Sequence, residues 1–149
     1  MTEKKRLLLI PGTSRDSIRE LIAFINSLIH VNSRINRIYI VGIKETIEVV
    51  GKSLPRDVLR EKKVILYRLI EQKDWGAQVL RIFVNTLPDV IVYFLRSMKD
   101  DEVFDTKYFY LIGIKGGSKI ISYAVDNRHV CLGDKYTSLS ELEKAIEEN

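Results

Sequence analysis

The chain has 149 residues, with 24 lysines and arginines against 20 aspartates and glutamates, and a formal net charge of +4. This length lets one domain bury a core without disulfides or metal ions, and the single cysteine, Cys131, excludes a disulfide framework and fits a reducing compartment. No apolar run approaches the ~20 residues that cross a bilayer, so we expect a cytoplasmic protein without a membrane span. Interspersed charges do not indicate a nucleic-acid-binding tail, although the basic balance favours a polyanionic ligand.

Apolar runs alternate with helical periodicity along most of the chain. Uninterrupted apolar runs are typical of strands covered on both faces, and apolar residues at a 3.6-residue spacing are typical of amphipathic helices. The pattern predicts, in chain order, strand Leu7–Pro11, helix Ser17–His30, strand Arg37–Ile43, a helix from Glu45 that breaks near Pro55, strand Val64–Ile70, a helix opened by Asp74 and running to Leu87, and strand Val90–Leu95.

The start of the first helix has two interpretations. Ser17 and Glu20 have the spacing of a capping box, which would begin the helix at Ser17 and leave the hydroxyls of Thr13 and Ser14 available to a ligand. In the alternative, Ser14 is the cap and Ser17 lies inside the helix.

The chain beyond Leu95 is ambiguous. Val103–Ile114 fits a helix, with aspartates at its amino end and glycines at its carboxyl end, or a strand paired across Gly116-Gly117; we favour the helix. The remainder predicts a β-hairpin of Lys119–Val125 and His129–Leu132. A short helix then follows Ser138, which forms a second capping box with Glu141.

These elements predict one Rossmann-like α/β domain over residues 1–149. Right-handed crossovers give a doubly wound, mainly parallel sheet with strand order 3-2-1-4, followed by the hairpin and the short helix. Strands one and four are then neighbours whose connections leave in opposite directions. The crevice at their carboxyl ends is where such sheets bind ligands.

Two loops meet at that crevice. A helix amino terminus, hydroxyls and cations together suit a phosphodiester. The candidate ligand-binding residues are Gly12, Thr13, Ser14 and Arg15 after strand one, and Arg96, Ser97 and Lys99 after strand four. In the structural alternative, Gly12 only turns the backbone, and Arg96 and Lys99 form surface ion pairs with nearby aspartates.

Several chemistries are disfavoured. The first loop has one glycine, Gly12, and lacks a dinucleotide fingerprint, while Gly117-Ser118-Lys119 opens a strand and not the helix of a Walker loop. His30 and His129 stand alone, so we expect no metal site and no cofactor. Glu45 could accept a hydrogen bond from a ribose hydroxyl, although a role at the helix start fits it better.

The strand Leu7–Ile10 with Gly12-Thr13-Ser14 resembles the first motif of the CRISPR-associated Rossmann fold (CARF) domains. The loop Arg96-Ser97-Met98-Lys99 stands where the second CARF motif lies, although the Thr-Gly-Gly of that motif is absent. If residues 108–114 were the strand that bears the motif, Lys119 would be the basic candidate in place of Lys99.

The resemblance implies a homodimer that binds a cyclic oligoadenylate, with cyclic tetra-adenylate the first choice. It also implies slow, metal-independent ring cleavage, in which Ser14 orients the phosphate and Lys99 or Arg96 stabilises the developing charge. Two other functions fit the sequence. One is a non-catalytic dimeric interaction module, and the other is direct RNA or DNA binding through basic residues such as Lys4, Lys5 and Arg6, which the charge pattern does not favour.

Overall fold

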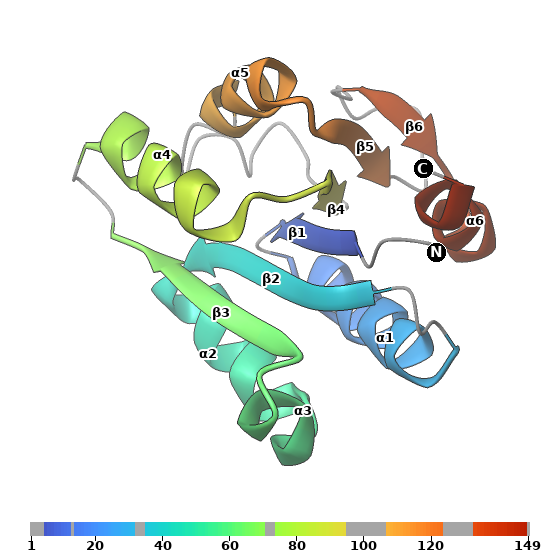
Figure 1. Ribbon diagram of the computed structural model, residues 1–149. Coiled ribbons are helices and arrows are strands. Elements are labelled where there is room, and N and C mark those ends of the chain that lie inside the picture. Colours follow the sequence, from blue (N-terminus) through green and yellow to red (C-terminus); the bar gives the residue numbers. More distant parts are fainter. Residues whose placement is uncertain are drawn as a thin grey trace.

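The computed structural model describes residues 5–12, 14–31, 35–70, 74–94, 107–123 and 133–148. Its strands are β1 Lys5–Pro11, β2 Ile35–Ile43, β3 Val64–Leu69, β4 Val90–Phe94, β5 Lys119–Tyr123 and β6 Asp134–Tyr136. Its helices are α1 Arg15–Val31, α2 Lys44–Ser53, α3 Arg56–Arg60, α4 Trp75–Thr86, α5 Lys107–Gly116 and α6 Leu139–Glu148. The strands form one sheet in the order β3-β2-β1-β4-β5-β6, and each neighbouring pair is parallel (Figure 1).

The predicted α/β class and the strand order 3-2-1-4 are confirmed. The predicted C-terminal hairpin is wrong, because β5 lies between β4 and β6 and runs parallel to both. Four consecutive buried residues, Ile120–Tyr123, explain this arrangement, since such a run belongs to an interior strand and not to an edge hairpin. The predicted second strand of the hairpin, His129–Leu132, lies outside the described residues.

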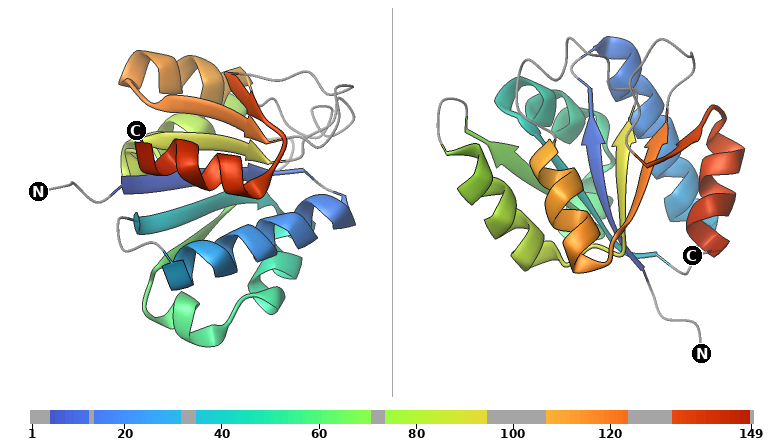
Figure 2. Two further views of the ribbon diagram at one scale, coloured as in Figure 1. Left: turned by 90° about the vertical axis from the view of Figure 1, so that its right-hand side faces the viewer. Right: turned by 90° about the horizontal axis from the view of Figure 1, so that it is seen from above.

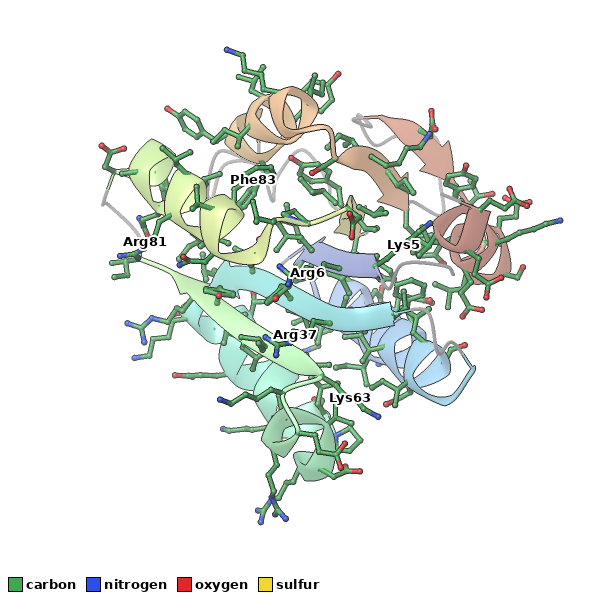
Figure 3. The ribbon with its side chains drawn as sticks, viewed as in Figure 1. Lys5, Arg6, Arg37, Lys63, Arg81 and Phe83 are labelled. Carbon is green, nitrogen blue, oxygen red and sulfur yellow. The ribbon has the colours of Figure 1, made fainter. Side chains whose placement is uncertain are left out.

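The prediction of a helix over Val103–Ile114 is confirmed for the residues that the structure describes, where α5 begins at Lys107. Gly116 ends this helix against α4. A Cβ built on Gly116 would lie 2.4 Å from Cζ of Phe83, so the absence of a side chain lets the two helices approach closely. Phe83 lies between α4 and α5 (Figure 3).

Helices cover both faces of the sheet (Figure 2). On one face, Leu7 and Leu9 of β1 pack in a cluster with residues of α1, α2, α3 and α6. On the other face, Leu8 and Ile10 pack with residues of α4 and α5. This alternation follows from the two-residue period of a strand, and burial on both faces explains why β1 is apolar without interruption from Leu7 to Pro11.

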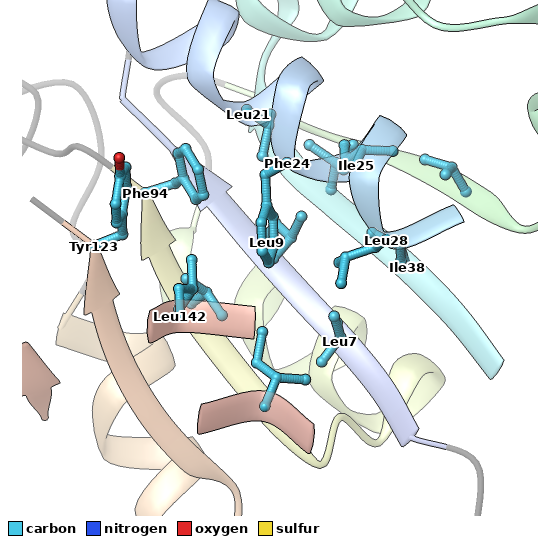
Figure 4. Close-up of a cluster of buried hydrophobic side chains, with 14 of the residues drawn as sticks. Leu7, Leu9, Leu21, Phe24, Ile25, Leu28, Ile38, Phe94, Tyr123 and Leu142 are labelled. Carbon is cyan, nitrogen blue, oxygen red and sulfur yellow. The ribbon is translucent and has the colours of Figure 1, made fainter. Parts of the chain in front are cut away.

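Aromatic rings join α1 to the middle of the sheet (Figure 4). Phe24 lies 5.5 Å from Phe94 of β4, and Phe94 lies 4.8 Å from Tyr123 of β5, measured between ring centroids. All three residues are buried. This contact holds α1 over β4, so the position of the amino end of α1 is fixed relative to the carboxyl edge of the sheet.

Candidate functional site

Ser17 joins the first turn of α1 to the ends of β1 and β4. Its side-chain oxygen, Oγ, donates to the carbonyl of Phe94 at 2.8 Å and accepts from the backbone N–H of Gly12 at 2.8 Å. Gly12 N–H also points at the Phe94 carbonyl, at 3.0 Å. Ser17 is buried, so the prediction that it caps the helix is wrong and its hydroxyl instead closes the crevice between the two strands.

Ser14 is the cap of α1, as in the alternative interpretation. Its Oγ accepts from the backbone N–H of Ser17 at 3.1 Å, and its carbonyl accepts from Ile18 N–H at 3.2 Å. The predicted partner in the capping box, Glu20, instead accepts a hydrogen bond from the hydroxyl of Tyr123. Capping uses an acceptor site of the Ser14 hydroxyl and leaves its O–H as a donor for a ligand.

The amino end of α1 presents donors at the surface. The side chains of Ser14, Arg15 and Asp16 are exposed, and the backbone N–H groups of Arg15 and Asp16 make no hydrogen bond to another described residue. The dipole of this 17-residue helix adds a partial positive charge at the same place. The carboxylate of Asp16 opposes the binding of an anion here.

A cleft of about 540 Å³ opens between α1 and α2 beside these groups. Its walls come from the first two turns of α1, from Ile43 at the end of β2, and from α2, so the cleft reaches the carboxyl edge of the sheet. The lining residues are Arg15, Ile18, Arg19, Ile22, Ile43, Glu45, Thr46, Val49 and Ser53.

The cleft combines an apolar wall with a charged rim. Ile18, Ile22 and Val49 supply the apolar wall. Val49 is 46% exposed, so its side chain is accessible to a ligand. Arg19 and Glu45 belong to the charged rim and are exposed. A volume in this range, with a mainly apolar surface and charged groups at the rim, suits a small organic ligand that carries an anionic part.

The structure brings together the predicted residues of the first loop. Gly12, Ser14 and Arg15 lie at the carboxyl end of β1, next to the end of β4. The other predicted residues of this crevice lie outside the described part of the chain; they are Thr13, Arg96, Ser97 and Lys99.

The structure places Lys119 at the edge of the sheet formed by the amino ends of the strands. It begins β5, pairs in register with the first residue of β4, Val90, and forms an ion pair with Asp134 at 2.7 Å. The carboxyl ends of the strands, where Ser14 lies, are at the opposite edge. The prediction that Lys119 shares a site with Ser14 is therefore wrong, because the helix before it returns the chain to the amino edge.

The sequence predicted only Arg15 and Glu45 among the residues that line the cleft, and two of those it missed, Arg19 and Val49, matter for a ligand. Arg19 lies one helical turn after Arg15 and so shares its face of α1, which is a signal that the sequence does contain. Val49 is an apolar residue on the polar side of α2. Single exposed apolar residues are common, so this signal has little weight without the neighbouring helix.

None of the described helices combines the length and the apolar character that a bilayer span requires. Within the same described ranges, no group of three or more histidine, cysteine or carboxylate side chains is arranged to hold a metal ion.

Comparisons with known proteins identify a fold but no family. No protein-family profile matches the chain, and no curated protein matches it. Among solved structures, it is similar to the Glycyrrhiza uralensis glycosyltransferase UGT73P12 complexed with glycyrrhetinic acid 3-O-monoglucuronide, with a TM-score of 0.56 and 12% sequence identity. The match covers 83% of this chain and 29% of that chain. This likeness supports a Rossmann-like fold.

Proposed function

We propose that this chain binds a cyclic oligoadenylate, with cyclic tetra-adenylate the first choice, at the carboxyl edge of β1. One phosphate would lie at the amino end of α1 and one adenosine in the cleft between α1 and α2. The observation that carries the proposal is that this cleft opens beside the helix terminus, with Arg15 lining both. A site for an apolar group and a site for an anion are therefore adjacent.

The phosphate would use four donors. These are the backbone N–H groups of Arg15 and Asp16, the O–H of Ser14 and the guanidinium of Arg15, which can bind two phosphate oxygens at once. The helix dipole and the guanidinium of Arg15 both place positive charge at this point, so both favour an anion over a neutral ligand.

The adenosine would use the cleft. Ile18 and Val49 offer apolar surface to the faces of the base, and the planar guanidinium of Arg19 can stack on it. Glu45 follows the end of β2 and lines the cleft, where its carboxylate can accept from a ribose hydroxyl. The helix-start role of Glu45 is compatible with this, since it also lies in the first turn of α2.

The CARF resemblance extends the proposal to slow ring cleavage without a metal ion. The ribose 2′-oxygen would attack the adjacent phosphorus, and the bond from phosphorus to the 5′-oxygen would break. The leaving 5′-oxygen takes up the proton that the 2′-hydroxyl releases. The product is a linear strand with a 2′,3′-cyclic phosphate at one end and a 5′-hydroxyl at the other. Ser14 would orient the phosphate, and Lys99 or Arg96 would stabilise its charge.

The same resemblance extends the proposal to a homodimer, in which a ring with two-fold symmetry meets the same residues of both copies. A chain that binds one adenylate of the ring by itself would still show a thermal shift. The binding test below therefore does not depend on the dimer.

Thermal unfolding with a panel of nucleotides tests the proposal. The panel contains cyclic tri-, tetra- and hexa-adenylate, linear oligoadenylates, ATP and NAD, each up to ~1 mM, because a ligand at 100 times its Kd stabilises the fold by about 2.7 kcal/mol. A shift selective for a cyclic adenylate supports the proposal. Chromatography of the incubated ligand then shows whether the ring is opened.

Two variants locate the site, and one serves as the matched control. Arg15→Ala should remove the phosphate contact and Val49→Arg should fill the cleft, so each should abolish the shift. Lys52→Ala removes an exposed cation from α2 outside the lining of the cleft and should leave the shift unchanged. No shift with any nucleotide, or a shift that both site variants retain, contradicts the proposal.

A further inference from the structure

Six of the large apolar side chains that are exposed among the described residues lie on α4, on the residue that caps its carboxyl end, and on α5. We refer to them as the α4–α5 surface; they are Leu80, Val84, Leu87, Tyr108, Leu111 and Ile114, with exposed fractions between 39% and 59%. The two helices lie side by side on the sheet face opposite α1 and α2 (Figures 1 and 2). The surface is thus remote from the cleft.

These side chains lie on two neighbouring helices. Leu80 and Val84 are four residues apart and form a stripe on α4, and Leu87 is the left-handed residue that ends this helix. The helices touch at both ends. A Cβ on Gly76 would lie 3.5 Å from the ring of Tyr108, and one on Gly116 would meet Phe83. The stripe on α4 therefore runs beside α5, and the two helices point in the same direction.

The extent of the α4–α5 surface suits a protein partner. Six side chains of this size, each about half exposed, present roughly 500 Å² of apolar area, which is near the upper limit for a monomer. A standard interface takes about 800 Å² from each partner, and it consists of such an apolar centre with a polar rim. The α4–α5 surface with its charged margin approaches that size.

The charges at its two ends make the surface complementary to itself. Asp74 caps the amino end of α4, with Oδ1 3.5 Å from the Cβ position of Gly76 and so beside Tyr108. Lys115 is in the last turn of α5, at the other end, and is exposed. Neither forms an ion pair with another described residue. A parallel copy would oppose like charges, whereas an antiparallel copy brings Asp74 to Lys115 twice.

We propose that two copies of this chain pair through the α4–α5 surface, with their helices antiparallel about a two-fold axis. Leu80 and Leu111 lie nearer its middle than Asp74 or Lys115, so they would pack close to the axis. The carboxyl edges of the two sheets then point in opposite directions. This dimer therefore differs from one that shares a cyclic ligand, and the inference does not rest on the proposed function.

Sedimentation equilibrium over a wide range of protein concentration tests the pairing. The parent chain should form dimers, and Leu80→Asp or Val84→Asp should weaken dimerisation by at least 100-fold, because each places a charge in an apolar interface. Both positions are more than half exposed, so the fold should remain. Val49→Asp is the matched control: it makes the same change at an exposed valine on the opposite face and should leave the dimer intact.

Charge variants test the antiparallel orientation. Lys115→Glu would oppose Asp74 in both symmetric contacts and should raise the dimer Kd about 3- to 10-fold at low salt. Adding Asp74→Asn, which preserves the helix cap, should recover part of that loss. Lys52→Glu makes the matched change in the last turn of α2 and should have no effect. A monomeric parent, a dimer unaffected by Leu80→Asp, or one unaffected by Lys115→Glu overturns the proposal.

Discussion

The hydroxyl of Ser17 donates to the carbonyl of Phe94 at 2.8 Å and so ties the first turn of α1 to the last residue of β4. The same hydroxyl accepts from Gly12 N–H at the end of β1. One buried side chain therefore fixes three elements at the edge where a doubly wound sheet binds its ligands.

Replacing Ser17 with alanine tests the importance of this connection for the fold. The Phe94 carbonyl keeps its bond from Gly12 N–H, so the loss is that of two hydrogen bonds, without an unsatisfied buried group. We expect the free energy of unfolding to fall by about 1–3 kcal/mol in urea titrations. Ser53→Ala removes an exposed hydroxyl that donates to Val49 and should cost less than about 0.5 kcal/mol. Equal losses would contradict the role of Ser17.

The sequence predicted the strands and helices well, because their apolar period reflects burial on the sheet. The role of Ser17 was not predictable in the same way. A serine three residues before Glu20 satisfies a local capping rule, and only the neighbouring strand β4 supplies the carbonyl that Ser17 binds. Likewise, parallel pairing of β5 with β6 depends on which strands flank β5, and a turn-like sequence does not determine this.

The site was predictable only in part for the same reason. Gly12, Ser14 and Arg15 follow β1 directly, so the sheet order alone places them at the crevice. The cleft depends on the packing of α1 against α2, which brings Arg19 near Val49 across 30 positions of sequence. Residues that form a cleft through packing leave no local motif.

Two substitutions of Ser14 separate its role as a cap from its role in binding. Ser14→Ala loses the cap and should destabilise the fold by about 1 kcal/mol. Ser14→Asp keeps the cap and should retain the parent's thermal stability, but its charge should repel a phosphate and abolish the shift with cyclic tetra-adenylate. If Ser14→Asp binds as the parent does, no phosphate lies at this helix end.

Removing the charge of Asp16 should strengthen binding of the proposed ligand. This exposed carboxylate lies in the first turn of α1, where it competes with an anion for the same dipole. Asp16→Asn should lower the Kd for the cyclic adenylate several-fold, while the free protein loses about 0.3–1 kcal/mol of stability. Glu48→Gln neutralises an exposed carboxylate of α2 that does not line the cleft, and calorimetry should find its Kd unchanged.

Two glycines with positive φ should respond differently to alanine. Gly133 has φ +73°, and a Cβ there would lie 2.2 Å from the carbonyl oxygen of Ile120. Gly117 has φ +82°, with nothing within 4 Å of its Cβ position. Gly117→Ala should therefore cost only the backbone term, about 1 kcal/mol, and Gly133→Ala at least twice as much, because backbone must move. Urea titration of both variants makes the comparison, and equal costs would refute the steric argument.

The hydroxyl of Tyr123 should add to the free energy of unfolding at neutral pH, and this contribution should disappear at high pH. Burial raises the pKa of Tyr123 above its ordinary value of 10.0, and the Glu20 carboxylate beside it raises this pKa further. The folded chain thus holds this proton more tightly than the unfolded chain. The resulting stability is fully present below pH 10 and declines as the pH rises from there through the folded pKa.

Tyr123→Phe isolates this contribution, because it removes the hydroxyl and preserves the ring that packs 4.8 Å from Phe94. Lysines and other tyrosines also titrate in this range, so the informative quantity is the difference between parent and variant in unfolding free energy, measured in urea from pH 8 to about 12. This difference should shrink above pH 10, because the parent then loses the stability that the un-ionised Tyr123 hydroxyl contributes. Glu20→Gln lowers the folded pKa of Tyr123 and should move the decline to lower pH. A difference that stays constant with pH would mean that Tyr123 is no harder to ionise in the folded chain than in the unfolded one.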